Sequence, residues 1–109
     1  LVKVVISNDN FALYFSRSVI PFERVDSTNQ SAESALEYHG HIGIYGFFAW
    51  SLEEFCALPK SPLESIEKLE QLRALWHRKE IFMTKVQTQS IGIDTLEDYK
   101  NAQKIMGDL

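Results

Sequence analysis

The chain has 109 residues, a length that suits one small domain. Its net charge of −4 argues against a general nucleic-acid binder, which usually has a basic surface. No apolar run approaches the roughly 20 residues that a membrane-spanning helix needs. The single cysteine, Cys56, excludes an internal disulfide and a cluster of thiolate metal ligands, and its apolar context LEEFCAL predicts a buried side chain.

The first 16 residues have the pattern of a β-hairpin. Two apolar runs, LVKVVI and FALYFS, flank SNDN, whose Asn and Asp residues favour a tight turn. The segment from about residue 24 to 38 is polar and lacks periodicity, which predicts a loop. The next run, HIGIYGFFA (residues 41–49), is apolar at both alternating positions, so we expect a strand covered on both faces.

Helices are predicted wherever a capping residue precedes an apolar pattern. Ser51 with Glu54 three residues later predicts a helix that begins at SLEEFCAL. Ser61, Pro62 and Glu64 form a second capping box at the start of residues 61–79. The apolar residues there recur every three positions, a spacing that drifts around an ideal helix and indicates a bend or break.

The last third of the chain continues the alternation of strands and helices. EIFMTKVQ (residues 80–87) and the short run IGI are strand-like, and Thr95 with Asp98 predicts the cap of a final helix. The expected order is therefore hairpin, loop, strand, helix, helix, strand, helix. This order predicts the α/β class.

Two candidate metal ligand sets can be considered from the residues alone. His39 and His41 would lie on one face of a strand, but structural zinc needs four protein ligands and no others are placed nearby, so polar residues at a strand entrance are the simpler interpretation. Asp94, between a short strand and a helix start, is placed to hold Mg²⁺ with substrate phosphates. From the residues alone, an ordinary turn carboxylate beside a helix N-terminus is the simpler interpretation of Asp94.

Two further groups have the chemistry to bind a polar ligand. Glu70 and Gln71 are neighbours on a predicted helix, where a solvated face is the ordinary interpretation. Ser16 and Arg17 end the hairpin, and an arginine there can bind a carboxylate through two hydrogen bonds. A surface arginine without a ligand is the alternative.

Four sequence blocks, in this order, resemble the C-terminal half of the CMP-Kdo synthetases, the 3-deoxy-manno-octulosonate (Kdo) cytidylyltransferases. The blocks are ALYFSRSVIPF, HIGIYGFFA, LPKSPLESIEKLEQLRALW and GIDTLEDY. The resemblance covers about residues 2 to 106 and implies a Rossmann-like nucleotide-diphospho-sugar transferase fold of the α/β class. It also implies conversion of CTP and Kdo to CMP-Kdo and pyrophosphate with Mg²⁺, by a cytoplasmic homodimer that serves lipopolysaccharide synthesis and has no membrane insertion.

The resemblance assigns roles to the candidate residues. Asp94 matches a catalytic Mg²⁺-binding carboxylate, and Arg17, with Ser16 beside it, matches the arginine near the sugar carboxylate. The other four matches line the Kdo pocket: His41, Tyr45, Glu70 and Gln71. His39 receives no role. Phe47 and Phe48 stand where the family often has Tyr-Arg, so no polar contact is expected from them.

The family's N-terminal CTP-binding half has no counterpart in these residues. We therefore expect residues 1–109 to be the acceptor-sugar-binding part of one cytidylyltransferase domain, inactive alone. Two other functions remain open. One is activation of a related keto-sugar acid, such as 8-amino Kdo or a sialic-type acid, and the other is a non-catalytic α/β binding module.

Overall fold

The computed structural model describes residues 1–24, 37–87 and 95–107. Its strands are β1 (Lys3–Ile6), β2 (Ala12–Ser16) and β3 (His39–Gly40), and its helices are α1 (Ala49–Ala57), α2 (Pro62–Glu67), α3 (Leu72–Trp76) and α4 (Leu96–Gly107). Within these residues no helix has the length and apolar character to span a bilayer.

The predicted hairpin is confirmed. β1 and β2 pair antiparallel from Lys3 opposite Ser16 to Ile6 opposite Ala12, with an irregularity in register after Val5. Asn10 adopts a left-handed conformation in the turn (φ 70°), which Asn tolerates better than most residues. The strand order β2-β1-β3 makes β1 the centre of the described sheet.

The predicted strand over residues 41–49 is wrong. β3 contains only His39 and Gly40, which pair antiparallel with Val4 and Lys3 of β1, and the chain from His41 to Phe48 is not in a strand. Most of that run is also uncovered, with Ile44 81% exposed. Residue alternation in the sequence predicted a strand buried on two faces, but the described residues supply neither a partner strand nor a covering layer along it.

The core lies where α2 and α3 pack on the hairpin. Phe15 of β2 and Leu72 of α3 are completely buried, and Val4 and Leu69 are nearly so. Each of these apolar side chains removes enough surface from water to stabilise the fold by about 1.5–3 kcal/mol. This contact fixes the end of β2 against the segment that joins α2 to α3.

The segment between α2 and α3 contains the break that the leucine spacing predicted. The Ser61 capping box is confirmed, since Ser61 Oγ accepts from Glu64 N and the Glu64 carboxylate accepts from Ser61 N. α2 ends at Lys68, a left-handed C-cap (φ 57°), and α3 starts four residues later. One periodic sequence segment thus forms two short helices.

Two predictions for the first helix are wrong. α1 begins at Ala49 with Phe48 as its N-cap, and Ser51 lies inside the helix, where its hydroxyl donates to the Phe48 carbonyl at 2.8 Å. Glu54 pairs with Lys79 rather than closing a capping box. Cys56 is exposed rather than buried.

The predicted strand over residues 80–87 is reduced to one antiparallel bridge between Phe82 and Phe11. The final helix is confirmed, and its cap is as predicted: Asp98 N donates to Thr95 Oγ1 at 3.0 Å and Thr95 N donates to Asp98 Oδ2 at 3.2 Å. The predicted loop falls mostly on residues 25–36, outside the described residues. So do the run IGI and Asp94.

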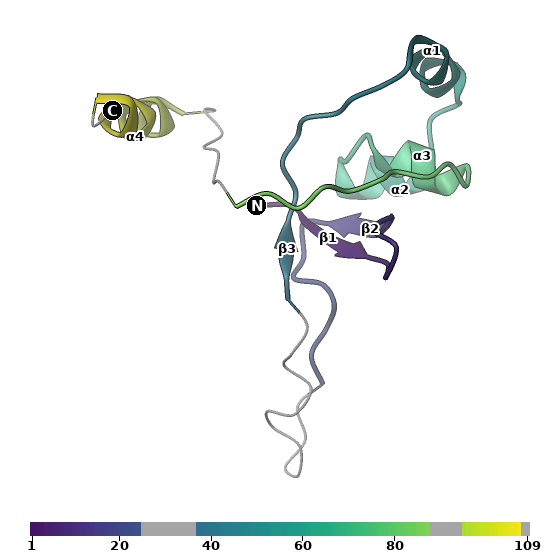
Figure 1. Cartoon of the computed structure of the whole chain (residues 1–109), viewed down its shortest axis with the longest axis horizontal. Coiled ribbons are helices and arrows are strands. Elements are labelled where there is room, and N and C mark those ends of the chain that lie inside the picture. Colours follow the sequence, from purple (N-terminus) through teal and green to yellow (C-terminus); the bar gives the residue numbers. More distant parts are fainter. Residues whose placement is uncertain (25–36, 88–94, 108–109) are drawn as a thin grey trace.

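The elements spread well beyond the small core. The radius of gyration is 17.0 Å, against about 13 Å for a compact domain of this length. Figure 1 shows α2 and α3 beside the sheet, α1 above them, and α4 well away from the sheet. Large apolar side chains are correspondingly exposed, including Phe48 (73%) and Trp50 (65%), which stack on each other.

Candidate functional site

His41 and Tyr45 form a hydrogen-bonded pair directly after β3. The Tyr45 hydroxyl lies 2.7 Å from His41 Nε2, and the His41 backbone N–H donates to the Val2 carbonyl at 2.7 Å. The imidazole also packs edge-on against the buried ring of Phe15, with ring centroids 5.0 Å apart. The chain therefore brings the two residues together by a bend rather than by the strand that the sequence predicted.

Burial sets the protonation of this pair. Desolvation lowers the pKa of His41 below its ordinary 6.5, so the imidazole is neutral at pH 7. Desolvation, with a smaller contribution from the charge of Glu70, raises the pKa of Tyr45 to about 12. The pair consequently presents two neutral groups that both donate and accept hydrogen bonds, as sugar hydroxyls require.

Glu70 and Gln71 occupy the turn between α2 and α3. The Glu70 carboxylate is exposed and lies 3.9 Å from the Arg73 guanidinium. Gln71 is the N-cap residue of α3 but makes no side-chain capping bond. The Glu70 charge contributes to the raised pKa of Tyr45, so this turn lies within electrostatic reach of that hydroxyl.

Ser16 and Arg17 lie where the end of β2 meets the end of α2. Arg17 Nε donates to the Glu67 carbonyl at 2.8 Å and Nη2 donates to the Lys68 carbonyl at 3.0 Å, so the guanidinium caps the C-terminus of α2. Ser16 is 4% exposed, accepts from Ser18 N at 3.1 Å, and donates to the Glu67 carboxylate. Arg17 is exposed and accessible, whereas Ser16 acts from inside the fold.

Sequence reasoning missed three residues that hold this region together. Glu64, expected only as a capping residue, forms a two-bond ion pair with Arg73 at 2.7 and 2.9 Å. Glu67 accepts hydrogen bonds from β2. The capping box identified Glu64 in the sequence. The pair Glu64–Arg73 depends on the helix break at Lys68, and the contacts of Glu67 depend on the packing of α2 against β2, so no local sequence signal predicts either.

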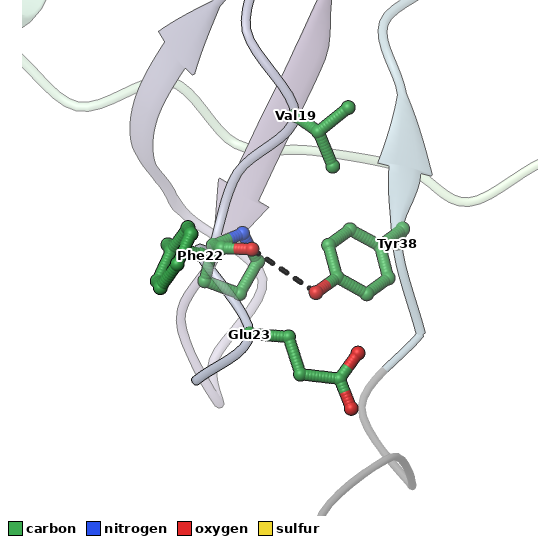
Figure 2. A pocket seen from close by; sticks show the side chains of 5 residues that line it. Val19, Phe22, Glu23 and Tyr38 are labelled. Carbon is green, nitrogen blue, oxygen red and sulfur yellow. Dashed lines mark hydrogen bonds between the residues drawn. The ribbon is translucent and has the colours of Figure 1, made fainter. Parts of the chain in front are cut away.

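The described residues include shallow hollows, of which one contains a predicted site residue and another does not. Figure 2 shows one lined by Val19, Pro21, Phe22, Glu23 and Tyr38, in which the Tyr38 hydroxyl donates to the Pro21 carbonyl at 3.0 Å. It includes none of the predicted site residues. The other, of about 350 Å³, includes Glu70 and its neighbour Arg73, together with Lys60, Glu64, Ser65 and Lys68.

The part of the chain that the structure describes contains no cluster of three or more His, Cys, Asp or Glu side chains able to hold a metal ion. His39 and His41 accordingly do not form such a cluster with a third residue there. The expected magnesium ligand, Asp94, lies outside that part.

Comparison with known proteins gives consistent matches. The family model described as cytidylyltransferase matches residues 1–81. A 3-deoxy-manno-octulosonate cytidylyltransferase of Wolinella succinogenes is 57% identical over 99% of this chain, which corresponds to 43% of that protein. One of Nitratiruptor sp. is 52% identical over 91% of the chain and 38% of its own length.

A solved structure agrees with the sequence matches. A CMP:2-keto-3-deoxy-manno-octonic acid synthetase complexed with CTP superposes with a TM-score of 0.85 at 34% identity, over 98% of this chain and 42% of the other. The α/β fold class and the expected partial coverage of the fold are thereby confirmed. The chain spans about two fifths of the length of the curated relatives that it matches.

Proposed function

Because the chain belongs to the cytidylyltransferase family, we propose that it forms the acceptor-sugar part of a 3-deoxy-manno-octulosonate cytidylyltransferase. The observation that carries the proposal is the 57% identity to a relative of that name over 99% of the chain. The alignment with this relative covers the segments that contain all the candidate residues. The relatives' names favour Kdo over related keto-sugar acids, and they favour an enzyme over a binding module.

In the proposed site, Arg17 binds the carboxylate of Kdo. Its guanidinium is anchored on two carbonyls of α2, and arginine suits a carboxylate because it presents N–H donors in a planar fork. His41 and Tyr45 bind sugar hydroxyls as a neutral pair, and Glu70 accepts from hydroxyl groups as a carboxylate, with Gln71 beside it. Ser16 supports Arg17 from the buried side.

These residues bind and orient the sugar for nucleotidyl transfer. The anomeric oxygen forms a bond to the α-phosphorus of CTP, the bond from that phosphorus to the bridging oxygen of the β-phosphate breaks, and pyrophosphate leaves as the hydroxyl proton is lost. Holding the acceptor oxygen in line with the phosphorus converts an encounter of two substrates into a step within one complex. A neutral His41 avoids placing a positive charge on sugar hydroxyls that need ordinary hydrogen bonds.

Magnesium is the proposed cofactor, with Asp94 as the ligand from this chain. Mg²⁺ sites that carry substrate phosphates commonly use only one or two protein carboxylates, so the lack of an acidic cluster in the described residues is compatible with such a site. When bound, the ion neutralises negative charge on the phosphates. The role of Asp94 is tested by Asp94→Asn, which should abolish Mg²⁺-dependent activity.

We also propose a cytoplasmic homodimer, since the family resemblance implies one and CTP is an intracellular substrate. Sedimentation of the active protein described below tests the assembly. A monomer at all concentrations would contradict it.

The function can be tested with a chimera in which residues 1–109 replace the matching part of the Wolinella succinogenes relative. The chimera should form CMP-Kdo and pyrophosphate from CTP, Kdo and Mg²⁺. Arg17→Ala should raise the KM for Kdo about tenfold or more, in keeping with the loss of a charge-assisted hydrogen bond. Arg78→Ala, an arginine with no assigned role, is the matched control, and equal effects of the two changes would contradict the assignment.

A further inference from the structure

The carboxylate of Glu67 lies at the junction between the end of β2 and the end of α2. It accepts a hydrogen bond from the Arg17 backbone N–H at 3.1 Å and further bonds from the hydroxyls of Ser16 and Tyr14. The Ser16 bond is the largest cause that lowers the pKa of Glu67, so the group is ionised and acts only as an acceptor at neutral pH. Two donors from β2 and the backbone N–H of the residue that follows it thus converge on a single helical side chain.

The contacts run in the opposite direction as well. The Arg17 side chain donates to the backbone carbonyls of Glu67 and Lys68, which are among the last carbonyls of α2 and have no partner within the helix. Arg17 and Glu67 therefore hold each other, backbone to side chain in both directions. Two of the five guanidinium N–H groups are used in these contacts, and the described residues offer no further partner for the other three.

The same junction leads directly into the second group of candidate residues. Lys68 ends α2 in a left-handed conformation, Leu69 is buried in the core, and Glu70 follows on the exposed side. Glu70 lies only three residues after Glu67, and Glu67 is hydrogen-bonded to Arg17. The position of Glu70 relative to Arg17 consequently depends on these hydrogen bonds and on the short segment from Glu67 to Glu70. A change at Glu67 would alter that relation without removing any group that touches a ligand.

We propose that Glu67 is a positioning residue that fixes the Arg17 guanidinium and the Glu70 turn relative to each other, so that both bind one sugar acid. The inference rests on the proposed function, since it takes Arg17 as the carboxylate ligand and Glu70 as a hydroxyl ligand. Glu67 itself is half-buried beneath the junction, where its carboxylate accepts from Arg17 N and from the Ser16 and Tyr14 hydroxyls.

The kinetic test uses the chimera of this chain with the Wolinella succinogenes relative. Glu67→Ala should raise the KM for Kdo about tenfold, while the KM for CTP and kcat stay unchanged. Glu67→Gln should restore most of the affinity, because its amide oxygen still accepts from Arg17 N and the two hydroxyls can reorient. Glu53→Ala, an exposed change on α1, is the control. An unchanged KM for Kdo, or a parallel change in kcat and both KM values, would overturn the proposal.

A second measurement does not depend on activity. In the chimera, hydrogen exchange of the Arg17 side-chain Nε–H, followed by NMR, should be slow with the original residue and with Glu67→Gln. It should be faster with Glu67→Ala, because the Glu67 carbonyl remains but the carboxylate no longer holds Arg17 N against α2. An inactive original chimera would refute the proposed function, and this measurement would then decide the positioning claim alone. Equal exchange in all three proteins would overturn the claim.

Discussion

The ion pair between Glu64 and Arg73 supports a quantitative prediction. Glu64 is 5% exposed and its two oxygens accept from Arg73 at 2.7 and 2.9 Å, while Ser61 N donates to one of them at 3.0 Å. These contacts, the Arg73 bond first, lower the pKa of Glu64 from 4.5 to about 2. At about 1.4 kcal/mol for each tenfold change, this depression corresponds to about 3 kcal/mol of stability at neutral pH.

The pH dependence follows from the direction of the shift. Because the folded-state pKa lies below the unfolded value, the stabilisation is complete above about pH 4.5 and is lost as the pH falls toward about 2. Glu64→Gln should remove this dependence. Glu64→Ala should lower the free energy of unfolding by about 3 kcal/mol at pH 7, since it leaves Arg73 without its main partner and also removes the cap bond.

Urea denaturation followed by circular dichroism measures these changes. Glu54→Ala is the matched control, because Glu54 forms an ion pair with Lys79 in which both side chains are more than 40% exposed. Exposed pairs contribute about 0–1 kcal/mol. A loss for Glu64→Ala no larger than that for Glu54→Ala would refute the reasoning. So would an identical pH profile for the original chain and Glu64→Gln between pH 5 and 2.

Three further predictions concern single residues. NMR titration of His41 should give a pKa below 6.5, because burial disfavours the charged ring, and a value above 6.5 would contradict its neutral state. The absorbance of tyrosinate can be titrated in the original protein and in Tyr45→Phe, and the difference between the two curves reports Tyr45. This difference should rise only near pH 12, and a rise near pH 10 would show that the hydroxyl is not desolvated. Lys68→Gly should raise the free energy of unfolding by about 0.5–1 kcal/mol, because Lys68 has φ 57° at a helix C-cap, and a lower urea midpoint would contradict this.

The sequence predicted the local elements better than the strands. The capping boxes at Ser61 and Thr95 were correct because their contacts lie within three residues, which a single sequence displays. The strand over residues 41–49 was wrong because a strand also needs a neighbour, and alternation does not say whether one is present. Ser51 failed as a cap because Ala49 and Trp50 extend the helix by two residues toward its N-terminus.

The candidate site was predicted from a family resemblance rather than from physical pattern, and the structure adds how its residues are held. His41 and Tyr45 were expected within a strand over residues 41–49, but they meet through a hydrogen bond after β3 has ended. The contacts of Arg17 with the carbonyls of Glu67 and Lys68 span about 50 residues of sequence. Such contacts depend on how α2 packs on β2, which residue spacing does not encode. The roles of the site residues remain predictions.

The most direct measurement of the central claim is pyrophosphate release by the chimera with CTP and Mg²⁺ over a set of sugar acids. The set contains Kdo, 8-amino Kdo and a sialic acid, with no sugar as the blank. The account predicts release with Kdo, at a kcat/KM above that for the other two acids. No release above the blank with Kdo, or a higher kcat/KM for the sialic acid, would contradict the assignment of this chain to the Kdo-binding part of the enzyme.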